Sequence, residues 1–134
     1  MSRPLRRDRG AAEAMGRRAE GLAALYLRLK GYHILGRRIT RPPIEIDILA
    51  RQAGTLVLVE VKYRQTLDQA VMALSPEALR RLLRAADQLA REAAWKSATR
   101  PARPGPPSVA ANARVDLIAL APWRWPRHIR NVHP

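Results

Sequence analysis

Residues 55–63, TLVLVEVKY, decide how this chain folds. Side chains alternate between the two faces of a β-strand, and one face of this segment is apolar and core-like along its length. That face carries Thr55, Val57, Val59, Val61 and Tyr63. The other face begins with Leu56 and Leu58 and ends with Glu60 and Lys62. A strand that is apolar on both faces along its first half is typical of the covered centre of a sheet. Ionised groups are rare there, so Glu60 and Lys62 together indicate a functional site at the end of the strand.

The preceding segment, residues 44–50, alternates in the same way and predicts a neighbouring strand. One face is expected to carry Ile44, Ile46 and Ile48, and the other Glu45, Asp47 and Leu49. A short loop around residues 52–54 joins the two strands into an antiparallel hairpin. In an antiparallel pair, the numbers of two directly opposed residues always add up to the same sum. Asp47 and Glu60 share a face only if that sum is odd, as when Glu45 faces Glu60. The two carboxylates then lie roughly 5 to 8 Å apart, close enough to share a metal ion.

Two helices are predicted on either side of this hairpin in the sequence. The first spans residues 11–30, with Gly31 placed to end it in a left-handed conformation. Its apolar stripe consists of Met15, Ala19, Leu22, Tyr26 and Leu29, with Glu20 at the border. The second spans residues 76–96, with Ser75 as its N-cap and Pro76 at the first helical position. Its stripe consists of Leu79, Leu82, Leu83, Ala86, Leu89, Ala90 and Ala93.

The remaining segments complete one α/β domain with a mixed sheet, because 134 residues are the usual size of a single domain. We predict an irregular strand at residues 32–40, a proline-rich loop at 98–111 and a buried strand at 114–120. The domain is expected to span residues 11–134 and to follow a basic, flexible arm at residues 1–10.

The tail after Pro122 contains two tryptophans that allow two interpretations. We expect Trp123 and Trp125 to pack as cover for the core, because tryptophans beside a buried strand usually do so. Base stacking on a nucleic acid is the alternative.

The charge of the chain points to a polyanion as partner. There are 25 Lys and Arg residues against 11 Asp and Glu, which gives a net charge of +14 and a pI of about 11.7. Nucleic acid is the first candidate, and a basic protein without such a partner is the alternative. The absence of cysteine excludes disulfides, thiol catalysis and cysteine-ligated zinc. No apolar run approaches the roughly 20 residues that span a bilayer, and no hydrophobic segment follows the basic arm, so we expect a cytoplasmic protein without a membrane partner.

Acidic residues beside a lysine on adjacent strands fit phosphodiester hydrolysis. That reaction uses a divalent cation to activate water and to neutralise charge on the phosphate, and hard cations such as Mg²⁺ prefer carboxylate oxygens. Asp47 and Glu60 can supply such oxygens, while Lys62 can orient the attacking water or stabilise the phosphate.

Together these segments resemble the PD-(D/E)xK nuclease superfamily, and within it the YraN-like (UPF0102) family, which is similar to archaeal Holliday junction resolvases. The resemblance covers most of residues 16–132 and rests on the order and spacing of several short motifs. These are GRRAE at 16–20, GY at 31–32, EID at 45–47, VEVKYR at 59–64, the helix segment 82–86, RVD at 114–116 and HIRN at 128–131.

The resemblance implies a restriction-endonuclease-like fold and a metal-dependent site that binds Mg²⁺ or Mn²⁺. Asp47 would be the principal metal ligand and Glu60 the second, the Val61 carbonyl would complete the protein ligands, and Lys62 would be the motif lysine. Glu20 would reach toward the site from the first helix, and Glu45 would lie just outside the ligands. Arg64, Arg80, Arg81 and Arg84 are the candidate DNA-binding residues.

The implied function is endonuclease cleavage of DNA, with branched or junction DNA as the leading substrate. Two-fold symmetric junctions favour a homodimer. The chain departs from the family pattern at Ile44, where glycine is usual, and at residues 75–79, which lack the usual lysine. Three alternatives stay open: a DNA-binding or scaffolding module without turnover, an ion pair of only structural importance, and an RNA-binding or ribosome-associated protein, which is supported by charge alone.

Overall fold

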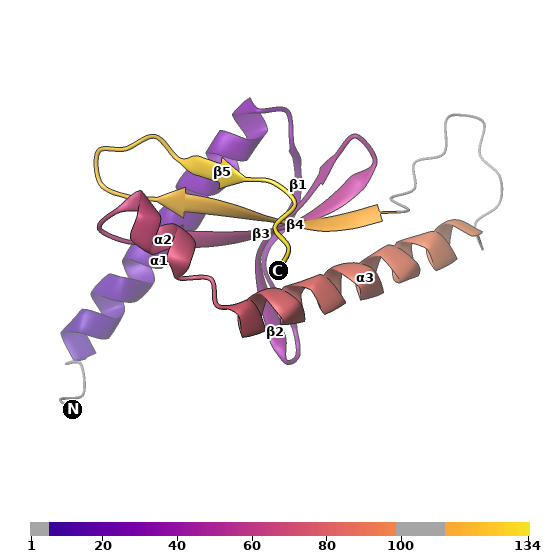
Figure 1. The fold of residues 1–134 in the computed structure, drawn as a ribbon, viewed down its shortest axis with the longest axis horizontal. Helices are drawn as coiled ribbons and strands as arrows, with labels where there is room; N and C mark the ends of the chain where they lie inside the picture. Colours follow the sequence, from indigo (N-terminus) through magenta and orange to yellow (C-terminus); the bar gives the residue numbers. More distant parts are fainter. Residues whose placement is uncertain (1–5, 99–111) are drawn as a thin grey trace.

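A five-stranded sheet lies between helices in the computed structural model, which describes residues 6–98 and 112–134 (Figure 1). The elements are α1 (Arg6–Leu29), β1 (His33–Arg41), β2 (Ile44–Gln52), β3 (Thr55–Tyr63), α2 (Leu67–Met72), α3 (Pro76–Ala98), β4 (Asn112–Leu120) and β5 (Arg127–Ile129). This mixed α/β arrangement is consistent with a restriction-endonuclease-like fold and confirms the predicted fold class.

The sheet has the order β1-β2-β3-β4-β5, and only the pair β3–β4 is parallel. The predicted antiparallel hairpin at its centre is β2–β3. Gln52 pairs with Thr55 across a two-residue turn, in which Ala53 and Gly54 both have positive φ, 48° and 79°. Two successive positive φ angles give the tight turn whose twist matches that of a hairpin. The turn fixes which residues of β2 and β3 lie opposite each other.

The register of this hairpin has the odd parity that allows Asp47 and Glu60 to share a face. The last pair toward the open end is Ile48 with Val59, whose numbers sum to an odd value. Continued by one residue, this register would place Asp47 opposite Glu60, rather than Glu45 as in the example of an odd register given above. The ladder stops before that point, although β2 goes on to pair with β1 as far as Ile44. The two central strands therefore separate beside Asp47 and Glu60.

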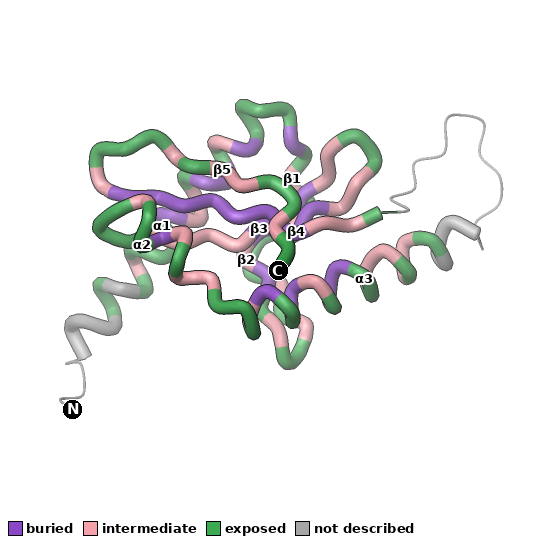
Figure 2. Tube along the Cα trace, viewed as in Figure 1, coloured by how far each residue is buried: buried purple, intermediate pink, exposed green. Residues whose placement is uncertain are grey.

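The two long helices cover opposite faces of the sheet, and Figure 2 shows buried residues along the central strands and on the helix sides that face them. The cluster under α1 includes Ala19, Ala23, Ala24 and Leu27 of the helix with Val57, Val59 and Ile118 of the strands. The cluster under α3 includes Leu79, Leu82 and Ala86 of the helix with Ile46, Leu58 and Val115 of the strands. Both central strands are therefore covered on both faces.

The prediction that Ile44, Ile46 and Ile48 share a face is wrong. Ile46 packs in the cluster under α3, with Ile44 against it, while Ile48 packs in the cluster under α1. Strict alternation requires a regular strand, and β2 loses its pairing with β3 at Asp47. The change of face at this residue turns Asp47 toward α1.

The buried stripe of α1 also differs from the prediction. Leu22 and Leu29 are 59% and 79% exposed, and the buried positions are mainly alanines. Alanines let the helix axis approach the sheet closely, so the stripe is set by small residues rather than by the larger leucines. The helix begins at Arg6, so residues 6–10 of the predicted flexible arm are helical, and residues 1–5 lie outside the described residues.

The second helix and the late strand confirm their predictions. Ser75 Oγ accepts a hydrogen bond from the backbone N–H of Ala78 at 3.1 Å, and α3 begins at Pro76. The short helix α2 was missed, although Thr66 caps it by accepting a hydrogen bond from Gln69 N–H at 3.1 Å. A Thr followed three residues later by Gln is a capping signature. Residues 99–111 of the proline-rich loop lie outside the described residues.

The tail contradicts the packing prediction for its tryptophans. Trp123 and Trp125 are 102% and 88% exposed, whereas the His128 side chain is almost fully buried. The loop between β4 and β5 extends past the end of the core, and Trp123 has a positive φ of 60°. None of the described helices is long and apolar enough to cross a membrane.

Candidate active site

A cleft of about 370 Å³ opens between α1 and the point at which β2 and β3 separate. Its lining brings together six of the residues singled out in the sequence, which are Glu20, Asp47, Glu60, Val61, Lys62 and Arg64. Met15, Gly16, Ala19 and Tyr63 complete the lining. We refer to Asp47, Glu60 and Lys62 as the cleft cluster.

Asp47 bridges the gap between the two separating strands. Its Oδ2 atom accepts a hydrogen bond from the backbone N–H of Val61 at 2.9 Å, so a side chain takes the place of the next ladder bond. The bond holds the carboxylate against the end of β3. The N–H and C=O of a strand residue point to the same side, so the Val61 carbonyl is expected to face the same gap.

Glu60 and Lys62 lie two residues apart on β3. Lys62 Nζ is 3.3 Å from Glu60 Oε1, and the two side chains are 25% and 14% exposed. One ammonium therefore lies beside two carboxylates in a largely buried position. The cluster carries an uncompensated negative charge when both carboxylates are ionised.

The electrostatics of the cleft cluster favour a bound cation. Burial is the largest cause that raises the pKa of Glu60, the negative charge of Asp47 adds to the rise, and the Lys62 ammonium offsets only part of it, so that the pKa is raised to about 7. Burial also raises the pKa of Asp47, against the lowering effect of the Val61 N–H, and Glu20 adds to the rise. A cation between the two carboxylates would reverse these shifts by stabilising their ionised forms.

The donor set suits a partly hydrated hard cation. Within residues 6–98 and 112–134, no three His, Cys, Asp or Glu side chains gather into a metal site. Mg²⁺ keeps several waters and is commonly held by one or two carboxylates plus substrate phosphates, rather than by a closed protein cage. Asp47 and Glu60, with the Val61 carbonyl, fit this mode of binding for Mg²⁺ or Mn²⁺.

Glu20 reaches the cleft from α1, as the resemblance implied, but its carboxylate is already paired. Arg38 Nε lies 2.7 Å from Glu20 Oε2, and Arg37 Nη2 lies 3.8 Å from the same atom. Arg38 occupies the β1 position next to Asp47, between the pairs Arg37–Ile48 and Ile39–Ile46. This arginine was not among the residues singled out in the sequence. Its signal is the charged pair Arg37-Arg38, which interrupts the alternation of β1.

Glu45 and the arginines of α3 lie outside the cleft. Glu45 lines a smaller hollow of about 140 Å³, together with Glu60 and Arg81. Arg81 and Arg84 line a neighbouring hollow beside the β1–β2 turn, and Arg80 is exposed on the same helix. Of the four candidate DNA-binding residues, only Arg64 therefore lies with the cleft cluster. Glu60 borders hollows on both sides of the separated strands.

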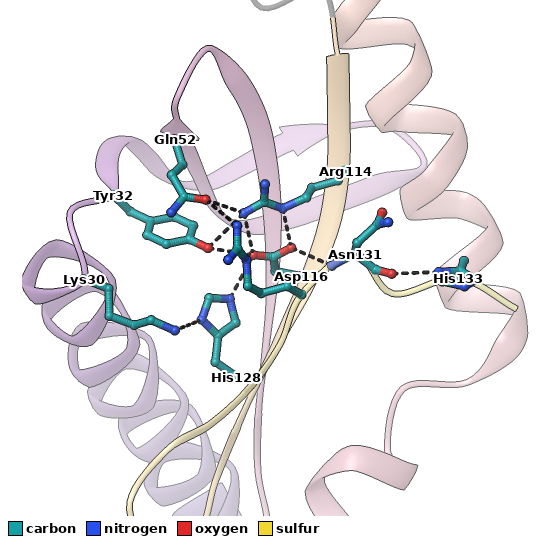
Figure 3. Close-up of polar contacts among 9 residues, drawn as sticks. Lys30, Tyr32, Gln52, Arg114, Asp116, His128, Asn131 and His133 are labelled. Atoms are coloured by element: carbon teal, nitrogen blue, oxygen red, sulfur yellow. Dashed lines mark hydrogen bonds and ion pairs between the residues drawn. The ribbon is translucent and has the colours of Figure 1, made fainter.

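A second polar cluster lies on β4 and ties the tail to the sheet (Figure 3). Asp116 is fully buried, and its carboxylate accepts hydrogen bonds from His128 Nε2 at 2.8 Å, Arg114 Nε at 2.9 Å, Asn131 N–H at 3.0 Å and Tyr32 OH at 3.4 Å. Lys30 Nζ lies 2.7 Å from His128 Nδ1. Because an ammonium can only donate, His128 carries its proton on Nε2 and donates it to Asp116. We refer to Arg114, Asp116 and His128 as the tail cluster.

The tail cluster is electrostatically satisfied. Burial alone would raise the pKa of Asp116, but the bonds from His128, Arg114 and the Asn131 N–H outweigh it and lower the pKa to about 2. No buried side-chain nitrogen or oxygen lacks a partner in the described part of the chain. The motifs at residues 114–116 and 128–131 were noted in the sequence but given no role there. In the structure their hydrogen bonds tie the tail to β4.

Comparison with known proteins gives consistent matches along nearly the whole chain. Residues 19–120 match the family described as "Uncharacterised protein family UPF0102". A UPF0102 protein of Caulobacter sp. (strain K31) is 46% identical, over 98% of this chain and 92% of its own length. A UPF0102 protein of Caulobacter vibrioides (strain NA1000 / CB15N) is 45% identical, over 96% of this chain and 94% of its own length. A UPF0102 protein of Chelativorans sp. (strain BNC1) is 41% identical, over 99% of this chain and 98% of its own length.

Proposed function

This chain belongs to the UPF0102 family, and from the geometry of its cleft we propose that it is a metal-dependent endonuclease that hydrolyses phosphodiester bonds in DNA. The observation that carries the proposal is the cleft cluster. Two carboxylates with raised pKa values and one lysine meet where two buried strands separate, in a chain with a net charge of +14. A merely structural ion pair would not need the second carboxylate or the opening to solvent.

Each residue of the cleft has a role in this proposal. Asp47, Glu60 and the Val61 carbonyl hold the Mg²⁺ or Mn²⁺ ion, which activates water and neutralises charge on the phosphate when bound. The hydrogen bond from Val61 N–H fixes the Asp47 carboxylate in place. Lys62 orients the attacking water and stabilises the extra charge on the phosphate in the transition state. Arg64, exposed at the edge of the cleft, binds a neighbouring phosphate.

Branched DNA is the substrate class that we propose, with a homodimer as the acting form on two-fold symmetric junctions. In support, cationic residues flank the cleft cluster on both sides of the sheet, with Arg64 on one side and Arg81 and Arg84 on the other. Such a distribution can contact more than one DNA arm. Because phosphate binding releases counterions, DNA affinity is expected to fall steeply between about 50 and 200 mM salt.

A DNA-binding or scaffolding module without turnover is the second candidate. Two observations favour it: Lys62 is already paired with Glu60, and Glu20 is already neutralised by Arg38. Both pairs would have to rearrange if Lys62 and Glu20 took part in catalysis.

Cleavage of a panel of linear, flapped and four-way DNAs separates the two candidates. The parent protein is compared with Asp47→Asn, Lys62→Ala and the control Asp87→Asn, which removes an exposed carboxylate from α3. The proposal expects Mg²⁺- or Mn²⁺-dependent cleavage by the parent and the control, lost on chelation. Asp47→Asn is expected to lose a factor on the order of 10² or more, since it removes a principal electrostatic element. Binding without cleavage by all four proteins would favour the module, and equal cleavage by all four would place the activity elsewhere.

Metal binding is measured separately from cleavage by thermal unfolding. A ligand at 100 times its Kd stabilises the folded state by about 2.7 kcal/mol. Mg²⁺ or Mn²⁺ is therefore expected to raise the Tm of the parent and of Lys62→Ala, but not that of Asp47→Asn. An equal rise in Asp47→Asn would exclude Asp47 as a ligand.

A further inference from the structure

The loop between β4 and β5, residues 121–126, presents two nearly fully exposed tryptophans. Trp123 and Trp125 expose 102% and 88% of their surface. An indole ring is among the largest apolar groups a protein can bury, so leaving two of them in water forgoes considerable stabilisation. Two prolines, Pro122 and Pro126, flank the pair and restrict the backbone on either side. The pair therefore indicates a ligand surface rather than part of the core.

The loop emerges beside the cleft. It follows directly on β4, whose last residue pairs with Tyr63 at the end of β3. The Arg64 N–H donates a hydrogen bond to the Leu120 carbonyl at 3.1 Å, which joins the edge of the cleft to the start of the loop. Figure 1 shows the loop extending from the end of the sheet at which β3 and β4 finish, next to α2. A polymer that leaves the cleft past Arg64 would meet this loop.

The protein surface between the cleft and the tryptophans is polar and partly cationic. A hollow of about 530 Å³ is lined by Gln65, Thr66, Leu67, Asp68, Pro122, Arg124 and Arg127. Arg127 is paired with Asp68 at 2.8 Å. Arg124, between the two tryptophans in sequence, is exposed and forms no ion pair with any described residue. Exposed aromatic rings beside an unpaired cation suit a ligand with both flat rings and phosphates.

We infer that this loop is a stacking platform for unpaired DNA bases, with Trp123 and Trp125 holding bases and Arg124 binding the phosphate between them. The identity of the ligand rests on the proposed function, because a DNA phosphate in the cleft brings the neighbouring nucleotides to the loop. Bases within a duplex are already stacked on each other, so the platform takes single-stranded segments. Branch points and flaps supply such segments. The platform thus gives the protein a preference for DNA with unpaired bases next to the cleavage point.

The test measures binding without metal, so that no cleavage is needed. Trp95→Phe leaves Trp123 and Trp125 as the only tryptophans, and their emission is followed by selective excitation of tryptophan. In this background and in chelator, an oligothymidylate of about 12 nucleotides is compared with an abasic oligonucleotide of equal length, which has the same phosphates but no bases. Oligothymidylate is expected to quench the emission and the abasic strand to leave it nearly unchanged. Equal quenching by both strands would overturn the inference.

Affinity of the variants gives an independent readout. Trp123→Ala and Trp125→Ala are each expected to weaken oligothymidylate binding by roughly 10- to 100-fold, with Phe at the same positions restoring most of it. Binding of a blunt duplex is expected to stay unchanged, whereas Arg124→Gln weakens binding of thymidylate and abasic strands alike. Unchanged thymidylate affinity in both Ala variants would overturn the inference. So would a change only in oligomeric state, seen by sedimentation, which would assign the loop to contact with a second copy.

Failure here and failure of the proposed nuclease are distinguishable. If the protein cleaves DNA with Mg²⁺ but binds oligothymidylate equally well without the loop tryptophans, only the stacking platform is refuted. If the loop tryptophans stack on bases but the protein cleaves no DNA, only the proposed nuclease function is refuted.

Discussion

The cleft cluster and the tail cluster are both built around buried carboxylates, yet their electrostatics are opposite. Glu60 in the cleft has its pKa raised to about 7, with burial as the main cause. Asp116 in the tail cluster is fully buried, but its pKa is lowered to about 2. Burial acts in the same direction at both places, so burial cannot explain the difference.

The number of donors explains the difference. Asp116 receives hydrogen bonds from two cationic or ring side chains, a backbone N–H and a tyrosine hydroxyl. In the cleft, one N–H bonds Asp47 and one ammonium lies beside Glu60, while the two carboxylates also repel each other. A satisfied buried carboxylate stabilises the fold, and an unsatisfied one weakens it and is available to a ligand. The two clusters therefore predict different results for the same kind of substitution.

The largest expected effect is on stability, in the tail cluster. Asp116→Asn leaves the largely buried Arg114 without its counterion and replaces one accepting oxygen by an NH2 group that cannot accept the bonds of His128, Arg114 or Asn131 N–H, so the free energy of unfolding is expected to fall by about 3 kcal/mol or more. Urea denaturation measures it. Leu117→Ala, in the adjacent buried position, provides a comparison for simple loss of packing. A loss for Asp116→Asn below about 1 kcal/mol would show that the tail cluster does not hold the fold together.

Glu60→Gln is expected to have the reverse profile. Removing a charge that burial opposes leaves the metal-free protein as stable as the parent or more so, while cleavage falls by a factor on the order of 10². Cleavage at saturating DNA and urea denaturation in chelator are measured on the same preparation. A variant that unfolds as easily as Asp116→Asn would refute the distinction between the clusters.

The response to pH is the next effect in size, and its sign differs between the clusters. The pKa of Asp116 is lower in the folded protein than its unfolded value near 4. This difference contributes about 2 kcal/mol to the stability above that unfolded pKa, and the contribution is lost as the pH falls through about 2. Glu60 has a raised folded pKa, so the stability of the metal-free protein falls as the pH rises from the unfolded pKa of Glu60 to its folded pKa of about 7, and levels off above it. Denaturation in chelator at pH 5 and pH 8 is expected to show this fall in the parent but not in Glu60→Gln. The same fall in both proteins would assign it to another group.

The smallest expected effect concerns the exposed pair that neutralises Glu20. The Arg38 side chain is 41% exposed, and solvent screens such pairs strongly, so Arg38→Gln is expected to lower the stability only slightly. Arg37→Gln, whose guanidinium is 3.8 Å from the same carboxylate, is the matched control and is expected to cost less still. A larger loss for Arg37→Gln than for Arg38→Gln would mean that the longer contact is the important one.

Much of the architecture could be predicted from local patterns in the sequence. The hairpin, α3 with its Ser75 cap and the strand at 114–120 follow from alternation, capping and apolar runs, which depend on residues close to one another in the chain. Alternation and an odd register predicted that Asp47, Glu60 and Lys62 meet, but they account for only part of the meeting, because β2 also changes face at Asp47.

Features that depend on tertiary packing could not be predicted in this way. Leucines and alanines both recur on α1, and only the closeness of the sheet decides that the alanines are buried. The separation of β2 from β3 at Asp47 leaves no local signal, so the change of face between Ile46 and Ile48 was missed. The exposure of Trp123 depends on where β4 ends relative to the core, which lies beyond any short window of sequence.

The position of β1 at the open edge of the sheet has a consequence for self-association. An exposed strand edge can pair with the edge of another molecule and start aggregation, and charged side chains are a common defence. β1 carries Arg37, Arg38 and Arg41, and its register shifts between Ile34 and Gly36. A second molecule that extended the sheet here would have to accommodate like charges and an irregular ladder. The edge at β1 is therefore protected against runaway strand addition.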